Sequence, residues 1–171
     1  LETAPPRTKD ESVDVAELLE NLKQQAQLLS GEQHHAITLD ADHALRLLGS
    51  REELLSAFSN LINNAVRYTP AKGAIRLVWR TTGAGAEFIV TDTGEGIELM
   101  HIPHLTERFY RVDTARSRAS GGTGLGLSIV KHVLLRHDAT LTIQSQPERG
   151  STFTCHLPDH RLASEDAVAR A

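Results

Sequence analysis

The sequence predicts an α+β domain in which amphipathic helices pack on a sheet. Three observations indicate this fold class. Apolar residues recur at helical spacing over 15–29, over 51–68 and from 127 onward. Short segments with alternating apolar and polar residues lie between and after these helices, as in half-buried strands. Clusters of glycine, proline, serine, aspartate and asparagine separate the segments, so the chain is expected to turn there.

The composition limits the possible size and partners of the domain. The chain has 171 residues, 40% of them hydrophobic, which suffices for one well-buried core and is short for two. Its 18 basic and 22 acidic side chains give a net charge of -4, so neither nucleic acid nor an anionic membrane is an expected partner. A single cysteine excludes an internal disulfide framework and favours a reducing, cytoplasmic compartment. No apolar run approaches the length of a membrane span, roughly 18 residues.

The two ends of the chain differ in composition from its middle. Residues 1–14 mix two prolines with charged and small polar residues, which indicates a linker. The domain is predicted to span 15–158, and the polar segment 159–171 is expected to be a frayed tail. Because the first residue is Leu1 and no signal peptide opens the chain, we expect a piece cut from a longer protein.

After the first helix, two short alternating segments at 36–39 and 44–48 are predicted to be strands. The neighbouring pair His34 and His35 is interpreted as a solvated turn. A metal site is disfavoured there, because no cysteine, aspartate or further histidine lies at ligand spacing.

The helix predicted at 51–68 is the strongest in the sequence. Its apolar stripe is made by Leu54, Phe58, Leu61, Ile62 and Ala65. A second stripe, about 135° away at 100° per residue, carries Asn60, Asn64 and Arg67. This polar stripe is either a plain solvent-facing surface or a site. The helix alone favours the plain surface, but asparagine is a mediocre helix former, so two asparagines one turn apart also point to a site.

A hairpin is predicted from strands at 75–81 and 87–91, and its second strand runs into the DxGxG segment at 92–97. Aspartate and glycine also make ordinary turns. The polar segment 98–120 follows, and a loop of this length in a compact domain is usually functional or mobile. Its arginines are Arg108, Arg111, Arg116 and Arg118.

A glycine-dense turn then leads into the last predicted helix. Gly122, Gly124 and Gly126 recur at every second residue, and the helix begins at Leu127. Unpaired N–H groups at a helix N-terminus attract anions, so this turn is a candidate phosphate site. Glycine-rich turns before helices are also common without any ligand, and the segment matches neither the Walker A pattern nor the dinucleotide fingerprint. Two closing strands are predicted at 140–144 and 151–157.

Five motifs follow one another within residues 50–157. They are NLINNAVRYTP at 60–70, DTGEGI at 92–97, ERFYRVD at 107–113, GGTGLGLSIV at 121–130 and GSTF at 150–153. In this order they resemble the N, G1, F, G2 and G3 boxes of the ATP-binding catalytic domain of sensor histidine kinases. The resemblance implies a two-layer α/β sandwich of the Bergerat or GHKL type, a mixed sheet with helices on one face. It also implies that Mg-ATP binds between the N-box helix and a lid.

The resemblance assigns roles to the polar stripe of the N-box helix. Asn64 matches the family's metal asparagine and would offer an amide oxygen to Mg²⁺, which prefers oxygen ligands. Asn60, one turn earlier, would assist directly or through water. Arg67 on the same face would meet phosphate charge, and Tyr68 resembles the ring that stacks on adenine.

Further nucleotide contacts are implied by the other boxes. Asp92 matches the carboxylate that accepts the N6 amino proton of adenine. Gly94 and Gly96 would permit close approach to the base, and Ile97 would line its apolar wall. The remaining nucleotide-binding residues implied by the resemblance are Gly122, Thr123, Gly124, Leu125, Gly126, Leu127 and Thr152.

The reaction implied by the resemblance is phosphoryl transfer from ATP to a histidine, followed by relay to a response regulator aspartate. Its implied catalytic residues are Asn60, Arg111 and Arg116, of which the arginines lie in the lid region and would stabilise phosphoryl charge. Relatives that hydrolyse ATP carry a glutamate at position 60 as a base, so Asn60 favours transfer over hydrolysis. The alternatives are a hydrolysing ATPase of the same superfamily and a nucleotide-binding module without catalysis.

The partners follow from the same resemblance. None of the nine histidines has the sequence context of the family's phosphoacceptor, so we expect the acceptor on a separate dimerisation domain of the full-length protein. The run at 101–118 is similar to that of kinases in phosphate-starvation signalling. The resemblance implies a monomeric cytoplasmic domain, without membrane contact of its own, from an inner-membrane protein.

Overall fold

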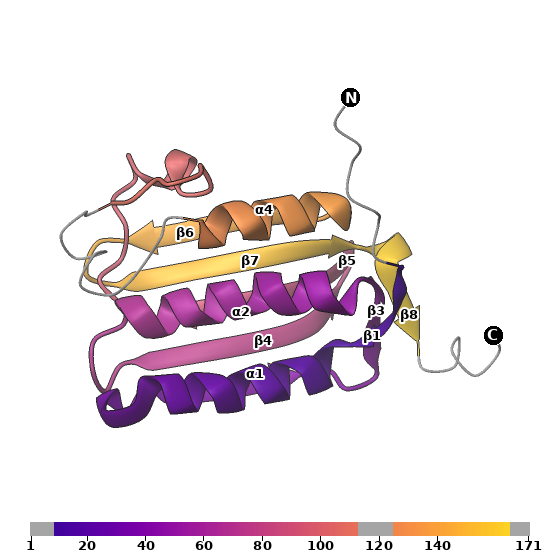
Figure 1. Ribbon diagram of the computed structural model, residues 1–171, viewed down its shortest axis with the longest axis horizontal. Coiled ribbons are helices and arrows are strands. Elements are labelled where there is room, and N and C mark those ends of the chain that lie inside the picture. Colours follow the sequence, from indigo (N-terminus) through magenta and orange to yellow (C-terminus); the bar gives the residue numbers. More distant parts are fainter. Residues whose placement is uncertain (1–8, 113–124, 165–171) are drawn as a thin grey trace.

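The computed structural model describes residues 9–112 and 125–164 of the chain. Three helices of this part lie side by side on one face of a sheet (Figure 1). They are α1 (Val15–Ser30), α2 (Arg51–Tyr68) and α4 (Gly126–Arg136). The two layers confirm the predicted α+β sandwich with helices on one face.

The main sheet has the strand order β2-β4-β5-β7-β6 within the described residues. Its strands are β2 (Ala36–Ala41), β4 (Ala74–Thr82), β5 (Gly85–Asp92), β7 (Gly150–Pro158) and β6 (Thr140–Gln146). Strands β2 and β4 are parallel, and the other neighbours are antiparallel. The sheet is therefore mixed, as the resemblance implied. The parallel pair needs a long crossover, which contains α2.

The core forms between the two layers. Phe58 of α2 packs on Phe88 of β5 with their ring centroids 4.4 Å apart. The Trp79 ring is 1% exposed, and its indole N–H donates to the carbonyl oxygen of Leu45 at 3.1 Å. Burial of a large aromatic side chain is strongly favourable when its polar atom keeps a partner. Helix α2 starts where the Ser50 hydroxyl accepts the N–H of Glu53 at 3.3 Å.

A second, smaller sheet includes residues on both sides of the predicted domain span 15–158. Its order is β1-β3-β8, from β1 (Glu11–Asp14), β3 (Leu45–Gly49) and β8 (Leu162–Ser164). Residues 11–14, expected in the linker, and 162–164, expected in the frayed tail, are thus strands on either side of β3. A 3-10 turn, η3 (Asp159–Arg161), precedes β8. These strands are very short, and their pairing partner is distant in sequence, so no local periodicity marks them.

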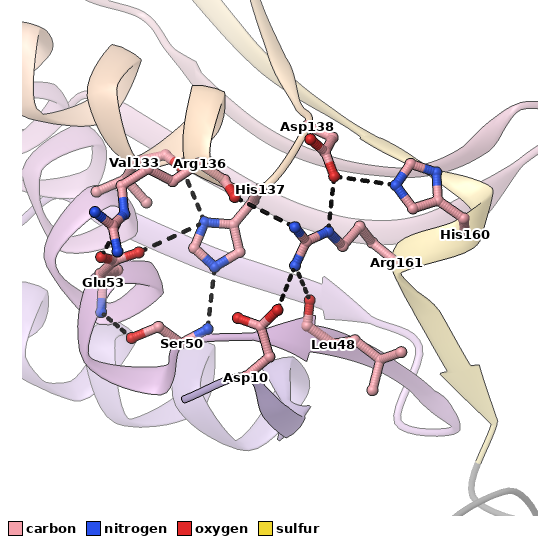
Figure 2. Close-up of polar contacts among 10 residues, drawn as sticks. All are labelled: Asp10, Leu48, Ser50, Glu53, Val133, Arg136, His137, Asp138, His160 and Arg161. Atoms are coloured by element: carbon pink, nitrogen blue, oxygen red, sulfur yellow. Dashed lines mark hydrogen bonds and ion pairs between the residues drawn. The ribbon is translucent and has the colours of Figure 1, made fainter. Parts of the chain in front are cut away.

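Arg161 joins the two terminal segments to the body of the domain. Its guanidinium donates to Asp10 Oδ2 at 3.0 Å and to Asp138 Oδ2 at 3.1 Å. It also donates to the carbonyl oxygens of Leu48 and Arg136, each at 3.3 Å (Figure 2). A planar guanidinium with five donors suits such a junction. This network explains why residues 159–164 belong to the folded domain.

The environment of His35 also differs from the predicted solvated turn. His34 is exposed, but His35 is buried. Its Nε2 donates to the carbonyl oxygen of Thr69 at 2.7 Å, and its Nδ1 lies 2.8 Å from the Ser30 hydroxyl. The ring therefore ties the end of α1 to the end of α2. The prediction was wrong because these partners come together only in the tertiary fold, and a buried histidine is stable when both nitrogens are paired.

Candidate nucleotide site

The polar stripe of α2 is partly covered in the fold. Asn60 and Asn64 are half-buried, whereas Arg67 and Tyr68 are exposed near the end of the helix. The Asn60 Nδ2 group donates to the carbonyl oxygen of Ser56 at 2.8 Å. Because a carbonyl oxygen can only accept, this bond orients the amide and leaves its Oδ1 pointing away from its own helix turn.

The start of α4 lies against Asn60. A Cβ placed on Gly126 would be 3.0 Å from Asn60 Oδ1, so only a glycine allows the amide this close without a shift. Within the described residues, no side chain caps the N-terminus of α4. The first N–H groups of a helix are the donors that attract phosphate. The structure therefore brings the N-box asparagine and the end of the glycine turn together.

Asp92 is the last residue of β5. Its side chain is buried, and its Oδ1 accepts the N–H of Gly94 at 2.8 Å. Burial raises the pKa of this carboxyl group, and backbone hydrogen bonds from Gly94 and Ser151 partly oppose the rise. A buried carboxylate that keeps accepting capacity can take a hydrogen bond from an amino group of a ligand.

The two glycines of the DTGEGI segment are required for different structural reasons. A Cβ on Gly94 would lie 2.7 Å from the carbonyl oxygen of Tyr68, so Gly94 lets this loop pack on the end of α2. Gly96 has a φ of +71°, and a Cβ there would lie 1.9 Å from the carbonyl oxygen of Gln146. Gly96 is thus required by the turn between β6 and β7. We expected it to allow approach of the base, but its closest neighbour is this backbone.

Ile97 is half-buried and packs against the core, and its N–H donates to the Ser145 hydroxyl at 2.7 Å. Ser145 in turn donates to the carbonyl oxygen of Gly150 at 2.9 Å and lies 2.7 Å from the Ser151 hydroxyl. These bonds fasten the loop after β5 to the β6–β7 turn. Ile97 therefore has a fixed position beside Asp92.

Thr152 lies apart from the other predicted residues. It pairs with Thr91, and their hydroxyls are 3.4 Å apart. Asp92 shares its face of β5 with the buried residues Phe88 and Val90, so its neighbour Thr91 points to the opposite face. The residue that pairs with Asp92 is Ser151, which is buried. Sequence reasoning missed Ser151. The alternation of buried and half-buried positions along β7 is the signal that could have identified it as the partner of Asp92.

Three of the remaining predicted residues lie in the described segments that border residues 113–124. Arg111 is half-exposed near the end of the first described segment, and Leu125 and Leu127 are half-buried at the start of the second. Leu127 packs against the core, and the carbonyl oxygen of Leu125 accepts from the Ser128 hydroxyl at 2.7 Å. Arg116, Gly122, Thr123 and Gly124 lie outside the described residues.

The predicted basic loop contains a short turn and a pair of hydrogen-bonded rings. The short turn is the 3-10 turn η2 (Ile102–His104). His101 Nδ1 and the Tyr110 hydroxyl are 2.5 Å apart, and Leu105 of the same segment is buried. Phe109 has a φ of +65° and is 69% exposed. The described part of this loop is therefore folded on itself.

The donor set limits which metal the site could hold. Across residues 9–112 and 125–164, no three side chains of histidine, cysteine, aspartate or glutamate are grouped as metal ligands. Amide oxygens from asparagine, completed by water and phosphate oxygens, fit Mg²⁺ rather than zinc. In the same part of the chain, no helix is long and apolar enough to cross a membrane.

Comparison with known proteins agrees with this geometry. Residues 49–161 match the family described as "Histidine kinase-, DNA gyrase B-, and HSP90-like ATPase". The chain therefore belongs to this family of ATP-binding proteins. Within the family, it is a histidine kinase ATP-binding catalytic domain, and it is similar to sensor kinases named PhoR and SenX3.

The curated relatives are much longer than this chain. The "Phosphate regulon sensor protein PhoR" of Pseudomonas aeruginosa is 52% identical over 96% of this chain and 37% of its own length. The protein of the same name from Haemophilus influenzae is 40% identical over 90% of this chain and 36% of its own. The "Sensor-like histidine kinase SenX3" of Mycolicibacterium smegmatis is 40% identical over 88% of this chain and 39% of its own length. The chain thus spans less than two fifths of these relatives.

Solved structures show the same fold. The "Mycobacterial sensor histidine kinase MprB" has a TM-score of 0.76 and 26% identity, and the match covers 87% of this chain and 97% of that one. The catalytic domain of histidine kinase ThkA has a TM-score of 0.77 and 20% identity, and the match covers 88% of this chain and 96% of that one. This architecture is therefore that of a histidine kinase catalytic domain.

Proposed function

We propose that this domain transfers the γ-phosphoryl group of ATP to a histidine on a dimerisation domain of its full-length protein. The group would then pass to an aspartate of a response regulator. The observation that supports transfer over hydrolysis is the placement of Asn60 between Ser56 and Gly126. An amide at this position cannot accept a proton from water, so it is no general base for hydrolysis.

We further propose that Asn64 and Asn60 hold Mg²⁺ through their amide oxygens. Both are half-buried on one stripe of α2, and Asn60 faces the start of α4, where no side chain of the described residues makes a capping bond. Bound Mg²⁺ would neutralise phosphate charge during transfer. Arg67 would meet phosphate charge from the end of the same stripe, and Tyr68 would present its exposed ring to the adenine base.

The lid residues complete the proposal. Arg111 and Arg116 would stabilise the charge of the transferring group, and Gly122 and Gly124 would bring backbone N–H groups to the phosphates. Asp92 would select adenine through the N6 amino group. Its burial supports this role, because an unpaired buried carboxylate is costly and therefore discriminates strongly between bases.

The biological setting is proposed from the relatives. Two of them, from Pseudomonas aeruginosa and Haemophilus influenzae, are named phosphate regulon sensor proteins. We infer that this domain serves phosphate-starvation signalling. It would act as the monomeric, cytoplasmic ATP-binding part of a membrane-anchored kinase.

A transfer assay tests this function. The chain is incubated with Mg²⁺ and γ-labelled ATP, alone and with the histidine-bearing dimerisation domain from its own full-length protein. We expect no self-labelling and very slow phosphate release alone, and acid-labile, base-stable label on the added domain. Rapid release of phosphate without an acceptor would instead identify a hydrolysing ATPase. Tight ATP binding without any transfer to the acceptor would identify a non-catalytic module.

A further inference from the structure

A buried histidine lies at the corner where α2 begins and α4 ends. His137 is 1% exposed, and its Nε2 is 3.0 Å from the backbone nitrogen of Ser50. Its Nδ1 is 2.8 Å from the carbonyl oxygen of Val133 (Figure 2). A backbone N–H only donates and a carbonyl oxygen only accepts, so the ring is neutral and carries its proton on Nδ1. Both ring nitrogens thus have defined roles.

The ring has little freedom to move. A Cβ on Gly49 would lie 2.4 Å from the His137 Cδ2 atom, so β3 ends in direct contact with the imidazole. On the other side, Glu53 Oε2 is 3.9 Å from Nδ1. The second oxygen of Glu53 pairs with the Arg136 Nε at 2.7 Å, so this carboxylate is already committed to α4. The imidazole is therefore held between β3, α2 and α4.

The same two helices meet again at the nucleotide site. Asn60 of α2 lies against Gly126, the first residue of α4. Ser50 and Asn60 are separated by about 15 Å along α2, and Gly126 and His137 by about 16 Å along α4, at 1.5 Å per residue. The helices are therefore antiparallel, with one contact at each end of the pair. Two contacts so far apart restrict rotation of one helix against the other.

We propose that His137 is a positioning residue of the nucleotide site. By accepting the N–H of Ser50, it fixes the start of α2 on the end of α4, and thereby aligns Asn60 with the N-terminal N–H groups of α4. This role rests on nucleotide binding between these two helices and not on phosphoryl transfer. If the acceptor is lost, the Ser50 N–H is left buried without a partner, and the helix pair shifts or admits water to satisfy it.

A matched pair of variants isolates the hydrogen bond. His137→Gln places an amide oxygen near the position of Nε2, where it can accept from Ser50. His137→Met has a similar length but only a weak acceptor. Affinity for Mg-ATP is measured by calorimetry on the full chain, under conditions where circular dichroism shows both variants folded. No acceptor domain is needed, so the result does not depend on whether transfer occurs.

We expect His137→Gln to bind Mg-ATP within about twofold of the wild type, and His137→Met to bind about tenfold more weakly, as one lost hydrogen bond produces. Amide exchange at Ser50 should be slow in the first variant and fast in the second. If the methionine variant unfolds, His137→Asn replaces it, because asparagine reaches Val133 but not Ser50. Equal wild-type affinity in both variants would limit His137 to stability, and equal loss in both would show that the ring itself matters; either result overturns the proposal.

Discussion

The side-chain oxygen of Asn60 lies 3.0 Å from the point that a Cβ would occupy on Gly126. Asn60 belongs to the middle of α2, and Gly126 is the first residue of α4. This contact joins the two motifs whose meaning was least certain in isolation, a polar helix stripe and a glycine-rich turn. Under the proposed function, it would make the stripe one wall of a phosphate-binding corner.

Gly126→Ala tests this contact directly. Alanine favours a helix by about 1 kcal/mol over glycine, so the melting temperature should stay the same or rise. The new methyl group should displace the Asn60 amide and weaken Mg-ATP binding by roughly tenfold, the equivalent of about 1.4 kcal/mol. Calorimetry and thermal melting measure the two effects. Gly83→Ala is the control, because a Cβ there meets nothing within 4 Å. Unchanged affinity in Gly126→Ala would separate Asn60 from the site.

Asn64→Ala tests the proposed metal ligand. Removal of the amide oxygen should abolish most of the gain in ATP affinity that Mg²⁺ provides, while binding without metal should change little. Phosphoryl transfer should fall more than binding. The control is Asn63→Ala, which removes the same side chain from the neighbouring position, about 100° around the helix. Affinity is titrated with and without Mg²⁺. If both variants respond to Mg²⁺ like the wild type, the metal lies elsewhere.

Asp92→Asn tests base recognition and carries a definite pH signature. Because burial raises the pKa of Asp92, its carboxylate takes up a proton at a higher pH than an exposed aspartate. Loss of ATP affinity on acidification should therefore begin above the usual aspartate range. In Asp92→Asn, this component of the pH dependence should disappear, and the preference for ATP over GTP, expected to be about tenfold or more, should shrink. Binding titrations with ATP and with GTP, between neutral and acidic pH, measure both effects.

The same raised pKa makes a prediction for stability. A carboxyl group with a folded-state pKa above its unfolded value favours folding most when it is protonated, and loses that contribution as pH rises through the folded pKa. Near neutral pH, ionised Asp92 is thus a cost to the fold. Asp92→Asn, which still accepts from Gly94, should be as stable as the wild type or more stable in urea. A large loss of stability would show that the charge itself is required for folding.

Gly96→Ala should be among the most damaging single substitutions in the domain. Its backbone has a φ of +71°, and the added Cβ would overlap the carbonyl oxygen of Gln146. Relief requires the β6–β7 turn to move, so we expect a loss of more than about 4 kcal/mol. Gly31→Ala is the matched control, since Gly31 has a φ of +51° with open space around it. That variant should lose only the cost of its unusual positive-φ backbone conformation, about 1–3 kcal/mol. Urea unfolding compares the two.

Cys155 should be chemically inert in the folded domain. Its side chain is fully buried in β7, and burial raises the pKa of the thiol to about 12. The reactive thiolate is therefore scarce at pH 8, and reagents cannot reach the sulfur. Modification by a disulfide reagent should be slow and limited by unfolding, and it should become fast in guanidinium chloride. Rapid modification of the native protein would mean that the main sheet opens locally at β7.

Much of the fold was predictable from local patterns. Amphipathic periodicity located α1 and α2 to within one residue of their ends, and the five motifs in order predicted the family. This worked because a helix or a half-buried strand records its own burial in the spacing of its apolar residues. The residue types of the site were also visible, since asparagine, aspartate and glycine supply oxygen ligands and close backbone approach.

Tertiary structure decided the strands and side-chain contacts that depend on partners distant in sequence. The strands β1 and β8 exist because each pairs with β3, and their own sequences are too short to show a period. Ser151 rather than Thr152 faces Asp92, because the register of β7 on β5 determines which residues share a face. The roles of His35 and His137 follow from carbonyl and amide groups that only folding brings within reach. Local sequence thus determined which elements form and which chemistry they carry. The pairing of those elements, a property of long-range contacts, determined which side chains meet.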